Sequence, residues 1–171
     1  GPCSPASPAQ GIRGTHPLMD SRTSGTTATV VLLLPRRRLL VAHVGDSRAV
    51  LGTRRRGVEA PGPWRSLELT RDHKPDLPDE RVRIEECGAQ VVTVGTPPHT
   101  THRVFTPHQG WPSINMSRSL GDLHAHTQGL TASAEVNVVE PLWEPALEDA
   151  VVILGSDGIW DVMDAATAVD L

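Results

Sequence analysis

The sequence predicts an α+β domain built mainly from antiparallel sheets. Three short segments rich in Val, Ala and Leu follow one another within residues 28–53, and a proline, glycines and arginines separate them. This pattern is typical of strands joined by tight connections. Helical patterns are few, and no regular alternation of strands with helices indicates a parallel sheet. With 171 residues, the chain has the size of one domain or a large part of one.

The expected elements follow from periodicity and from turn residues. Residues 1–23 contain four prolines by position 17 and no hydrophobic period, so we expect a flexible lead-in there. Residues 57–66 and 95–112 have the composition of loops. Strands are expected at residues 28–34, 39–44, 48–53, 67–70, 90–94, 114–116, 136–139 and 150–154.

Two helices are predicted from their end signals. Asp76 can cap a helix that starts near Pro78, and the acidic residues that follow favour the positive end of its dipole. Gly88 supplies a stop for this helix. Asp164 is expected to cap a last helix over residues 165–171.

Composition limits the classes of partner. The net charge of −4 gives no reason to expect nucleic acid, and no apolar run approaches the roughly 20 residues that span a bilayer. The arginine triplets at residues 36–38 and 54–56 are short and separate, and we expect solvated turns there rather than a binding patch. Cys3 and Cys87 lack ligand spacing, so neither a zinc site nor a disulfide is expected, which favours a reducing compartment. We expect a monomer in the cytoplasm or nucleus.

Three strands run into a small residue followed by an aspartate. The aspartates are Asp46, Asp122 and Asp157, and a further carboxylate, Asp161, follows four residues after Asp157. Carboxylates mounted on strand ends suit hard cations such as Mg²⁺ or Mn²⁺. Turn formation, in which the aspartate bonds its own backbone, is the alternative for each of them.

Several segments together resemble the metal-dependent serine/threonine protein phosphatases of type 2C, the PPM family. They occur in the family's order and cover residues 24–171. The matching segments are SGTTA at 24–28, GDSRAVL at 45–51, LTRDHKP at 69–75, ERVRI at 80–84 with Gly88, SRSLGD at 117–122 and SDGIWDV at 156–162.

The resemblance implies a four-layer sandwich, with two antiparallel sheets between layers of helices and a two-metal site at one end. It implies that Asp157 is catalytic and bridges to the Mg²⁺ or Mn²⁺ pair, and that Asp46 and Asp161 belong to a weaker third metal site. Asp122 is expected to be structural, and residues 80–116 correspond to a flap beside the active site. The expected reaction is hydrolysis of phosphoserine or phosphothreonine in protein substrates by a metal-activated water.

The sequence departs from this pattern at two motifs. An Asp-Gly-His-Gly segment is expected upstream of Ser24 and an Asp-Asn motif downstream of residue 171, and neither motif occurs in this chain. We therefore expect a partial catalytic domain, incomplete at both ends, in which Asp157 alone remains of the core carboxylates. The alternative function is a non-catalytic pseudophosphatase that binds phosphoproteins or regulates a partner.

Overall fold

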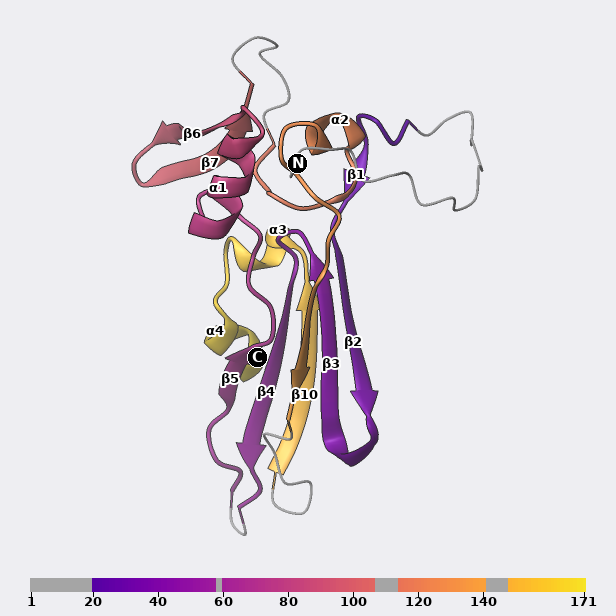
Figure 1. Cartoon of the computed structure of the whole chain (residues 1–171). Coiled ribbons are helices and arrows are strands. Elements are labelled where there is room, and N and C mark those ends of the chain that lie inside the picture. The colour runs from indigo at the N-terminus through magenta and orange to yellow at the C-terminus, as the bar shows by residue number, and fades with distance from the viewer. Residues whose placement is uncertain (1–19, 58–59, 107–113, 141–147) are drawn as a thin grey trace. The chain divides into compact units, whose positions relative to one another are not determined.

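The computed structural model describes residues 20–57, 60–106, 114–140 and 148–171. The expected lead-in over residues 1–23 lies almost wholly outside these residues. The chain forms two compact units (Figure 1). Unit 1 consists of Gly1–Thr27 and His73–Ser133, and unit 2 consists of Ala28–Asp72 and Ala134–Leu171.

Unit 2 contains two antiparallel three-stranded sheets. The first has the order β2-β3-β9. The second has the order β10-β4-β5 (Figure 1). The strands are β2 (Ala28–Leu34), β3 (Arg38–Val44), β4 (Arg48–Arg55), β5 (Arg65–Glu68), β9 (Glu135–Val139) and β10 (Glu148–Gly155). A 3-10 turn, η1 (Pro35–Arg37), joins β2 to β3. The predicted antiparallel α+β fold is confirmed, and each of these strands overlaps a segment that the sequence predicts.

Alternating side chains hold the two sheets together. Leu39 and Val41 of β3 pack with Ala49 and Leu51 of β4, and all four are buried. The opposite face of the second sheet carries Val50, which packs under two short helices, α3 (Asp157–Trp160) and α4 (Ala165–Asp170). As predicted, Asp164 caps α4, because its carboxylate accepts a hydrogen bond from the Thr167 N–H at 2.7 Å.

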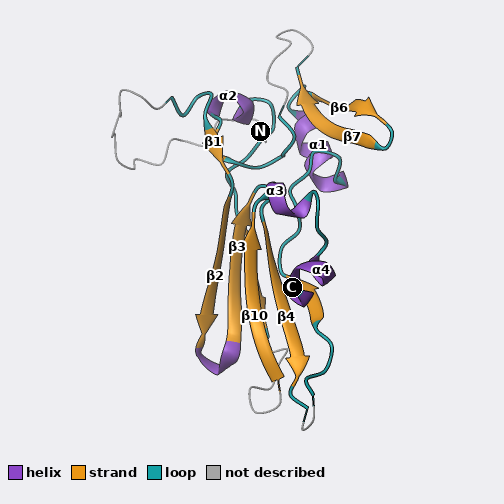
Figure 2. Ribbon diagram, turned by 180° about the vertical axis from the view of Figure 1, so that it is seen from behind, coloured by secondary structure: helices purple, strands orange, loops and turns teal. Residues whose placement is uncertain are grey.

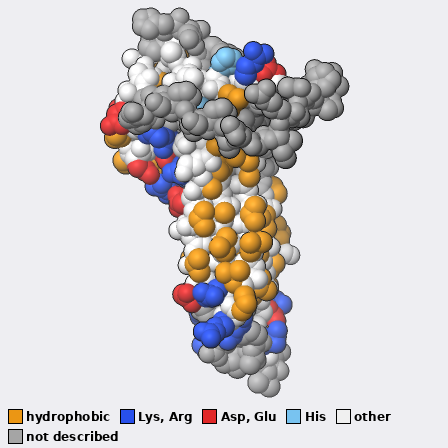
Figure 3. Space-filling view, turned by 45° about the vertical axis from the view of Figure 1, so that its right-hand side comes forward, with side chains coloured by type: hydrophobic (Ala, Val, Ile, Leu, Met, Phe, Trp, Pro, Cys, Tyr) orange, Lys and Arg blue, Asp and Glu red, His pale blue; other side chains and the backbone are white. Residues whose placement is uncertain are grey.

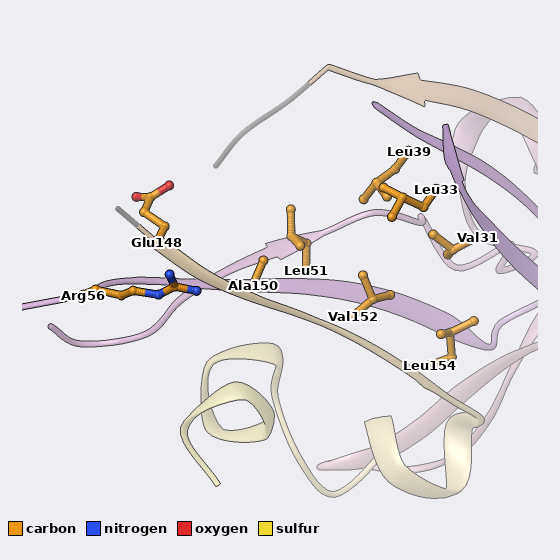
Figure 4. A pocket seen from close by; sticks show the side chains of 9 residues that line it. All are labelled: Val31, Leu33, Leu39, Leu51, Arg56, Glu148, Ala150, Val152 and Leu154. Carbon is orange, nitrogen blue, oxygen red and sulfur yellow. The ribbon is translucent and has the colours of Figure 1, made fainter. Parts of the chain in front are cut away.

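The space between the sheets is only partly filled. A cavity of about 450 Å³ lies there, lined mostly by aliphatic side chains of β2, β3, β4 and β10 (Figure 4). The outer side of the first sheet is also apolar, and Val30, Leu32, Val136 and Val138 are 47–56% exposed there. Among the described residues, helices cover the second sheet of unit 2, and no helical layer covers the outer side of the first.

Unit 1 combines two helices with two antiparallel strand pairs. Its helices are α1 (Pro78–Glu86) and α2 (Leu123–His126), and its strands are β1 (Gly25–Thr26), β6 (Gln90–Thr96), β7 (His99–Phe105) and β8 (Leu120–Gly121). β6 pairs with β7 (Figure 2). β1 pairs with β8. A small core forms around Ile84 of α1, Val104 of β7 and Ala125 of α2. The flap assignment of residues 80–116, which lie in this unit, stays a prediction.

A buried carboxylate fastens α1 to the segment that precedes β8. Glu80 is fully buried and pairs with the guanidinium groups of Arg83 at 2.7 Å and Arg118 at 2.6 Å. The Ser117 hydroxyl also donates to Glu80. Burial raises the pKa of Glu80, but the hydrogen bonds from Arg83, Arg118 and Ser117 outweigh it and hold that pKa far below its usual value.

Three local predictions for unit 1 are wrong. Leu77 rather than Asp76 is the N-cap of α1, because Pro78 forces the preceding residue into an extended conformation. The predicted loop at 95–112 contains β7, whose Thr and Val residues favour a strand despite the prolines on either side. The predicted strand at 114–116 is reduced to one isolated bridge between Ile114 and Val104.

The prediction that the cysteines stay unpaired is also wrong. Cys87, the C-cap residue of α1, is disulfide-bonded. Sequence spacing cannot show which distant segments meet in space, so this pairing left no local signal. The expectation of a reducing compartment rested on unpaired cysteines, so it loses its basis. No helix in the described part of the chain is long and apolar enough to cross a bilayer.

Replacing Leu51 with alanine tests the core between the sheets of unit 2. Because Leu51 is 1% exposed, we expect Leu51→Ala to lower the free energy of unfolding by about 2–4 kcal/mol in urea. Leu33→Ala is the matched control, since Leu33 is 70% exposed, and it should cost well under half as much. Equal losses for the two variants would contradict this account of the core.

The pH dependence of stability tests the Glu80 network. The folded-state pKa of Glu80 lies below its unfolded value of about 4.5, so its contribution is complete above pH 4.5 and is lost as the pH falls further. Urea unfolding at pH 7 and at pH 3.5 should therefore show a smaller loss of stability for Glu80→Gln than for the wild type. Glu85→Gln, on the exposed side of α1, should lose as much stability between pH 7 and pH 3.5 as the wild type does. A Glu80→Gln difference equal to that of the wild type would refute the assignment.

Candidate metal and phosphate site

The pairing of β4 with β10 places two predicted ligands at one end of a sheet. The two strands pair antiparallel over their full length, and the ladder ends with Gly155 opposite Arg48. Asp46 lies two residues before Arg48, and Asp157 lies two residues after Gly155. Both aspartates therefore leave the sheet at the same end, although 110 positions separate them in the sequence.

A tight turn holds Asp46. Gly45 has a φ of +100°, a conformation that a side chain would disfavour, and it lets the chain turn from β3 into β4. The Thr29 hydroxyl donates to the Ser47 carbonyl at 3.1 Å and ties the turn to β2. Asp46 is 2% exposed. A carboxylate this deeply buried must be hydrogen-bonded or paired with a cation, whereas an aspartate in a solvated turn needs no such partner.

A second turn holds Asp157 at the start of α3. The Trp160 indole N–H donates to the Gly155 carbonyl at 2.7 Å, and a Cβ at position 155 would lie only 3.1 Å from that nitrogen. A side chain at this position would crowd the indole that closes over the strand end. The Asp157 carbonyl accepts from the Asp161 N–H at 2.8 Å. Asp157 is half-buried and Asp161 is exposed.

The three predicted ligands have donor atoms of the right type, but these atoms do not all lie close to one another. Carboxylate oxygens are the donors that Mg²⁺ and Mn²⁺ prefer. In the part of the chain that the structure describes, however, Asp46, Asp157 and Asp161 do not form a group whose oxygens all lie within 4.8 Å of one another. Their assignment as metal ligands stays a prediction. The donor type fits a divalent ion, and two ions would need donors beyond these three.

Arg48 gives this end of unit 2 a fixed positive charge. Its guanidinium pairs bidentately with Asp72, at 2.7 and 3.0 Å, and lies 3.6 Å from Glu68. The Asp72 hydrogen bond is the main cause of a raised Arg48 pKa, and Asp161 adds to it through space. The arginine of the GDSR segment and the aspartate of the RDHKP segment are therefore partners of each other. The sequence motifs identified both segments, but they did not show that Arg48 and Asp72 form an ion pair.

The segment that contains Asp72 has three further attachments. The Thr70 hydroxyl accepts from the Ala49 N–H at 3.0 Å, and a ring nitrogen of buried His43 lies 2.9 Å from the Arg71 carbonyl oxygen. Arg71 also reaches Glu135 of β9 at 3.7 Å. His43 was not singled out from the sequence, because one polar residue in an apolar strand gives no distinctive signal. These bonds fix the loop after β5 against β3 and β4.

The Asp122 carboxylate packs against Gly25, and the structural role expected of Asp122 stays a prediction. A Cβ on Gly25 would lie 1.8 Å from an Asp122 carboxylate oxygen, so Gly25 leaves the space in which that carboxylate lies. Gly25 also pairs with Gly121 in the β1–β8 ladder. The SGTTA and SRSLGD segments therefore meet in unit 1. This close packing explains why a glycine stands in the first segment opposite an aspartate in the second.

Breaking the bidentate ion pair should destabilise unit 2 measurably. Both side chains are at least three-quarters buried, so we expect Asp72→Asn to cost about 1–2 kcal/mol of unfolding free energy. Glu68→Gln is the control, because Glu68 is 54% exposed and more distant, and it should cost less than about 0.5 kcal/mol. A double-mutant cycle with Arg48→Gln, which removes the charge, should give a coupling free energy clearly above zero. A coupling of zero would show that the pair contributes nothing.

Comparisons with known proteins agree with this arrangement of motifs. A family model described as protein phosphatase 2C matches residues 10–171. "Probable protein phosphatase 2C 18" of Arabidopsis thaliana is 38% identical over 156 residues, which are 91% of this chain and 29% of that protein. "Probable protein phosphatase 2C 64" of Oryza sativa subsp. japonica is 39% identical over 157 residues, which are 91% of this chain and 34% of that protein.

A solved structure shares the fold. The crystal structure of serine-threonine phosphatase 2C from Toxoplasma gondii matches with a TM-score of 0.64 and 29% identity, over 86% of this chain and 46% of that chain. The chain spans about a third of the length of the two curated relatives. The family model and the relatives together establish that the chain belongs to the protein phosphatase 2C family.

Proposed function

We propose that the protein hydrolyses phosphoserine and phosphothreonine esters in protein substrates. One observation carries the proposal: the β4–β10 register brings Asp46 and Asp157 to one end of a sheet, in a chain of the protein phosphatase 2C family. The family is metal-dependent, and the carboxylates at this end are the donors that a hard divalent ion requires. Phosphoproteins are the substrate class that the family implies.

Asp157 is proposed as the main ligand, with Asp46 and Asp161 at a weaker position. When bound, Mg²⁺ or Mn²⁺ would supply an activated water and would neutralise charge on the phosphoryl group. The chain's own contribution is positioning. The Trp160–Gly155 hydrogen bond fixes the turn that carries Asp157, and the positive φ of Gly45 fixes the turn that carries Asp46.

A second candidate function is non-catalytic binding of phosphoproteins. The observation that favours it is that the described Asp46, Asp157 and Asp161 do not gather within mutual ligand distance. A protein that binds without turnover would need no such set. The two candidates differ in whether inorganic phosphate is released.

Replacing Asp157 tests the catalytic proposal. In the full-length native protein, we expect Asp157→Asn to abolish Mn²⁺-dependent release of phosphate from a phosphothreonine peptide, with at least a hundredfold loss of rate, because a primary ligand is lost. Asp170→Asn is the matched control, since Asp170 is an exposed aspartate at the end of α4. It should keep the wild-type rate.

The metal requirement is checked in the same assay. EDTA should stop phosphate release, and added Mn²⁺ or Mg²⁺ should restore it. Near-normal turnover by Asp157→Asn would contradict the assignment of that residue. A full-length wild type that binds the peptide but releases no phosphate with either ion would favour the non-catalytic candidate.

A further inference from the structure

Arg48 lies at the same end of the β4–β10 ladder as the proposed metal ligands. Its backbone is opposite Gly155, the last residue of β10. Asp157 follows Gly155 by two residues and begins α3, and Asp161 is the C-cap residue of that helix. A cation fixed at Arg48 therefore acts on any ion that binds at the end of this ladder.

Carboxylates hold the Arg48 side chain in one position. Asp72 accepts a hydrogen bond from its Nε at 2.7 Å and from one of its terminal nitrogens at 3.0 Å. Glu68 lies 3.6 Å from the guanidinium. The side chains of Arg48 and Asp72 are only 25% and 16% exposed. Because two hydrogen bonds to one carboxylate orient a guanidinium, the positive charge has a defined place.

A third carboxylate, that of Asp161, attracts Arg48 through space. The hydrogen bond to Asp72 is the main cause of a raised Arg48 pKa. The charges of Glu68 and Asp161 raise that pKa further, whereas burial lowers it. Asp161 is exposed, and it is one of the proposed ligands of the weaker metal position. The charge that attracts its carboxylate repels a divalent cation bound there, so Arg48 and the cation compete for Asp161.

Asp72 limits this competition. A bidentate pair with a mostly buried carboxylate is stronger than an attraction to an exposed one, so Asp72 holds Arg48 back from Asp161. If Asp72 loses its charge, the guanidinium is released and its charge acts on Asp161 in full. If Arg48 loses its charge instead, the carboxylates around it keep theirs. The two changes therefore shift the attraction for a divalent cation in opposite directions.

We propose that the Arg48–Asp72 pair sets the divalent-cation affinity at Asp161, with Arg48 opposing the cation and Asp72 restraining Arg48. Arg48 is in this sense a positioning residue, since it acts through Asp161 and not on the substrate. The inference rests on the proposed function, which assigns Asp46 and Asp161 to a weaker metal position. It supplies a reason, from the chain's own charges, for a cation to be held weakly there.

A purely structural ion pair would give a different result. Such a pair would only hold the loop after β5 against β4. Removing either Arg48 or Asp72 would then loosen the same end of unit 2, and cation binding would weaken in both variants. The charge mechanism predicts opposite signs for the two variants, so the direction of each change separates the two explanations.

The test is a titration of Mn²⁺ into the isotope-labelled 171-residue chain, with the dissociation constant taken from broadening of the Asp161 amide resonance. Substrate and turnover are absent, so the result does not depend on catalysis. We expect Arg48→Gln to bind Mn²⁺ about threefold to tenfold more tightly than the wild type, and Asp72→Asn to bind it more weakly by a similar factor. Arg48→Gln/Asp72→Asn should stay within about twofold of the wild type, because it loses one charge of each sign.

Two arginine variants are the controls. Arg48→Lys keeps the charge and should bind Mn²⁺ as the wild type does. Arg54→Gln removes a charge from the same strand, where Arg54 pairs with Asp149 at 3.2 Å, about 20 Å along β4 from Arg48. Figure 3 shows hydrophobic side chains over the middle of unit 2, with Lys and Arg side chains grouped at one end of this apolar surface. Arg54→Gln should therefore leave the Mn²⁺ affinity unchanged.

The outcomes separate this inference from the proposed function. Weaker Mn²⁺ binding by both single variants would show a structural pair and overturn the inference, as would an affinity of Arg48→Gln equal to that of the wild type or of Arg54→Gln. In each of these cases, wild-type broadening at residues 45–47 and 156–161 would still support a metal site at this end. A wild-type chain in which Mn²⁺ broadens neither aspartate turn would overturn both the inference and the proposed metal site.

Discussion

The antiparallel ladder between β4 and β10 is the constraint on which the rest of unit 2 depends. It pairs Arg48 with Gly155 at one end and Arg55 with Glu148 at the other. Because a shift by one residue would turn every side chain of a strand to the opposite face, Leu51 between the sheets and Val50 under the helices fix this register. The same register then decides which polar residues gather at each end.

The two ends of this ladder have opposite character. Aspartates leave the strands at the end where β3 turns into β4, and arginines gather where β2 turns into β3. Both groups extend from rigid strands that a shared apolar core holds in place.

Much of the fold could be predicted, because strand periodicity is local. The run at 28–34 is a strand over those same residues, and Asp164 caps α4 as its position before an apolar segment indicates. β7 was missed because the prolines around it outweighed its threonines. The disulfide at Cys87 depends on a contact with a distant segment, which no local pattern records.

The site could be predicted only in part, for a related reason. The motifs identified the family correctly, but a motif does not say what each of its residues does. Arg48 and Asp72 pair with each other, Glu80 pairs with Arg118, and Gly25 makes room for Asp122. These residues stabilise the fold, so much of the signature reflects packing. Asp46 and Asp157 lie at the sheet end that the motifs implied, and their metal-binding role stays a prediction.

The most direct test of the central claim is to titrate Mn²⁺ into isotope-labelled chain and follow paramagnetic broadening of amide resonances by NMR. The register of β4 and β10 predicts that residues 45–47 and 156–161 broaden first and together, while residues 36–38 and 54–56 at the opposite end stay sharp. Broadening that starts elsewhere, or that affects only one of the two aspartate turns, would contradict a metal site at the end of this ladder.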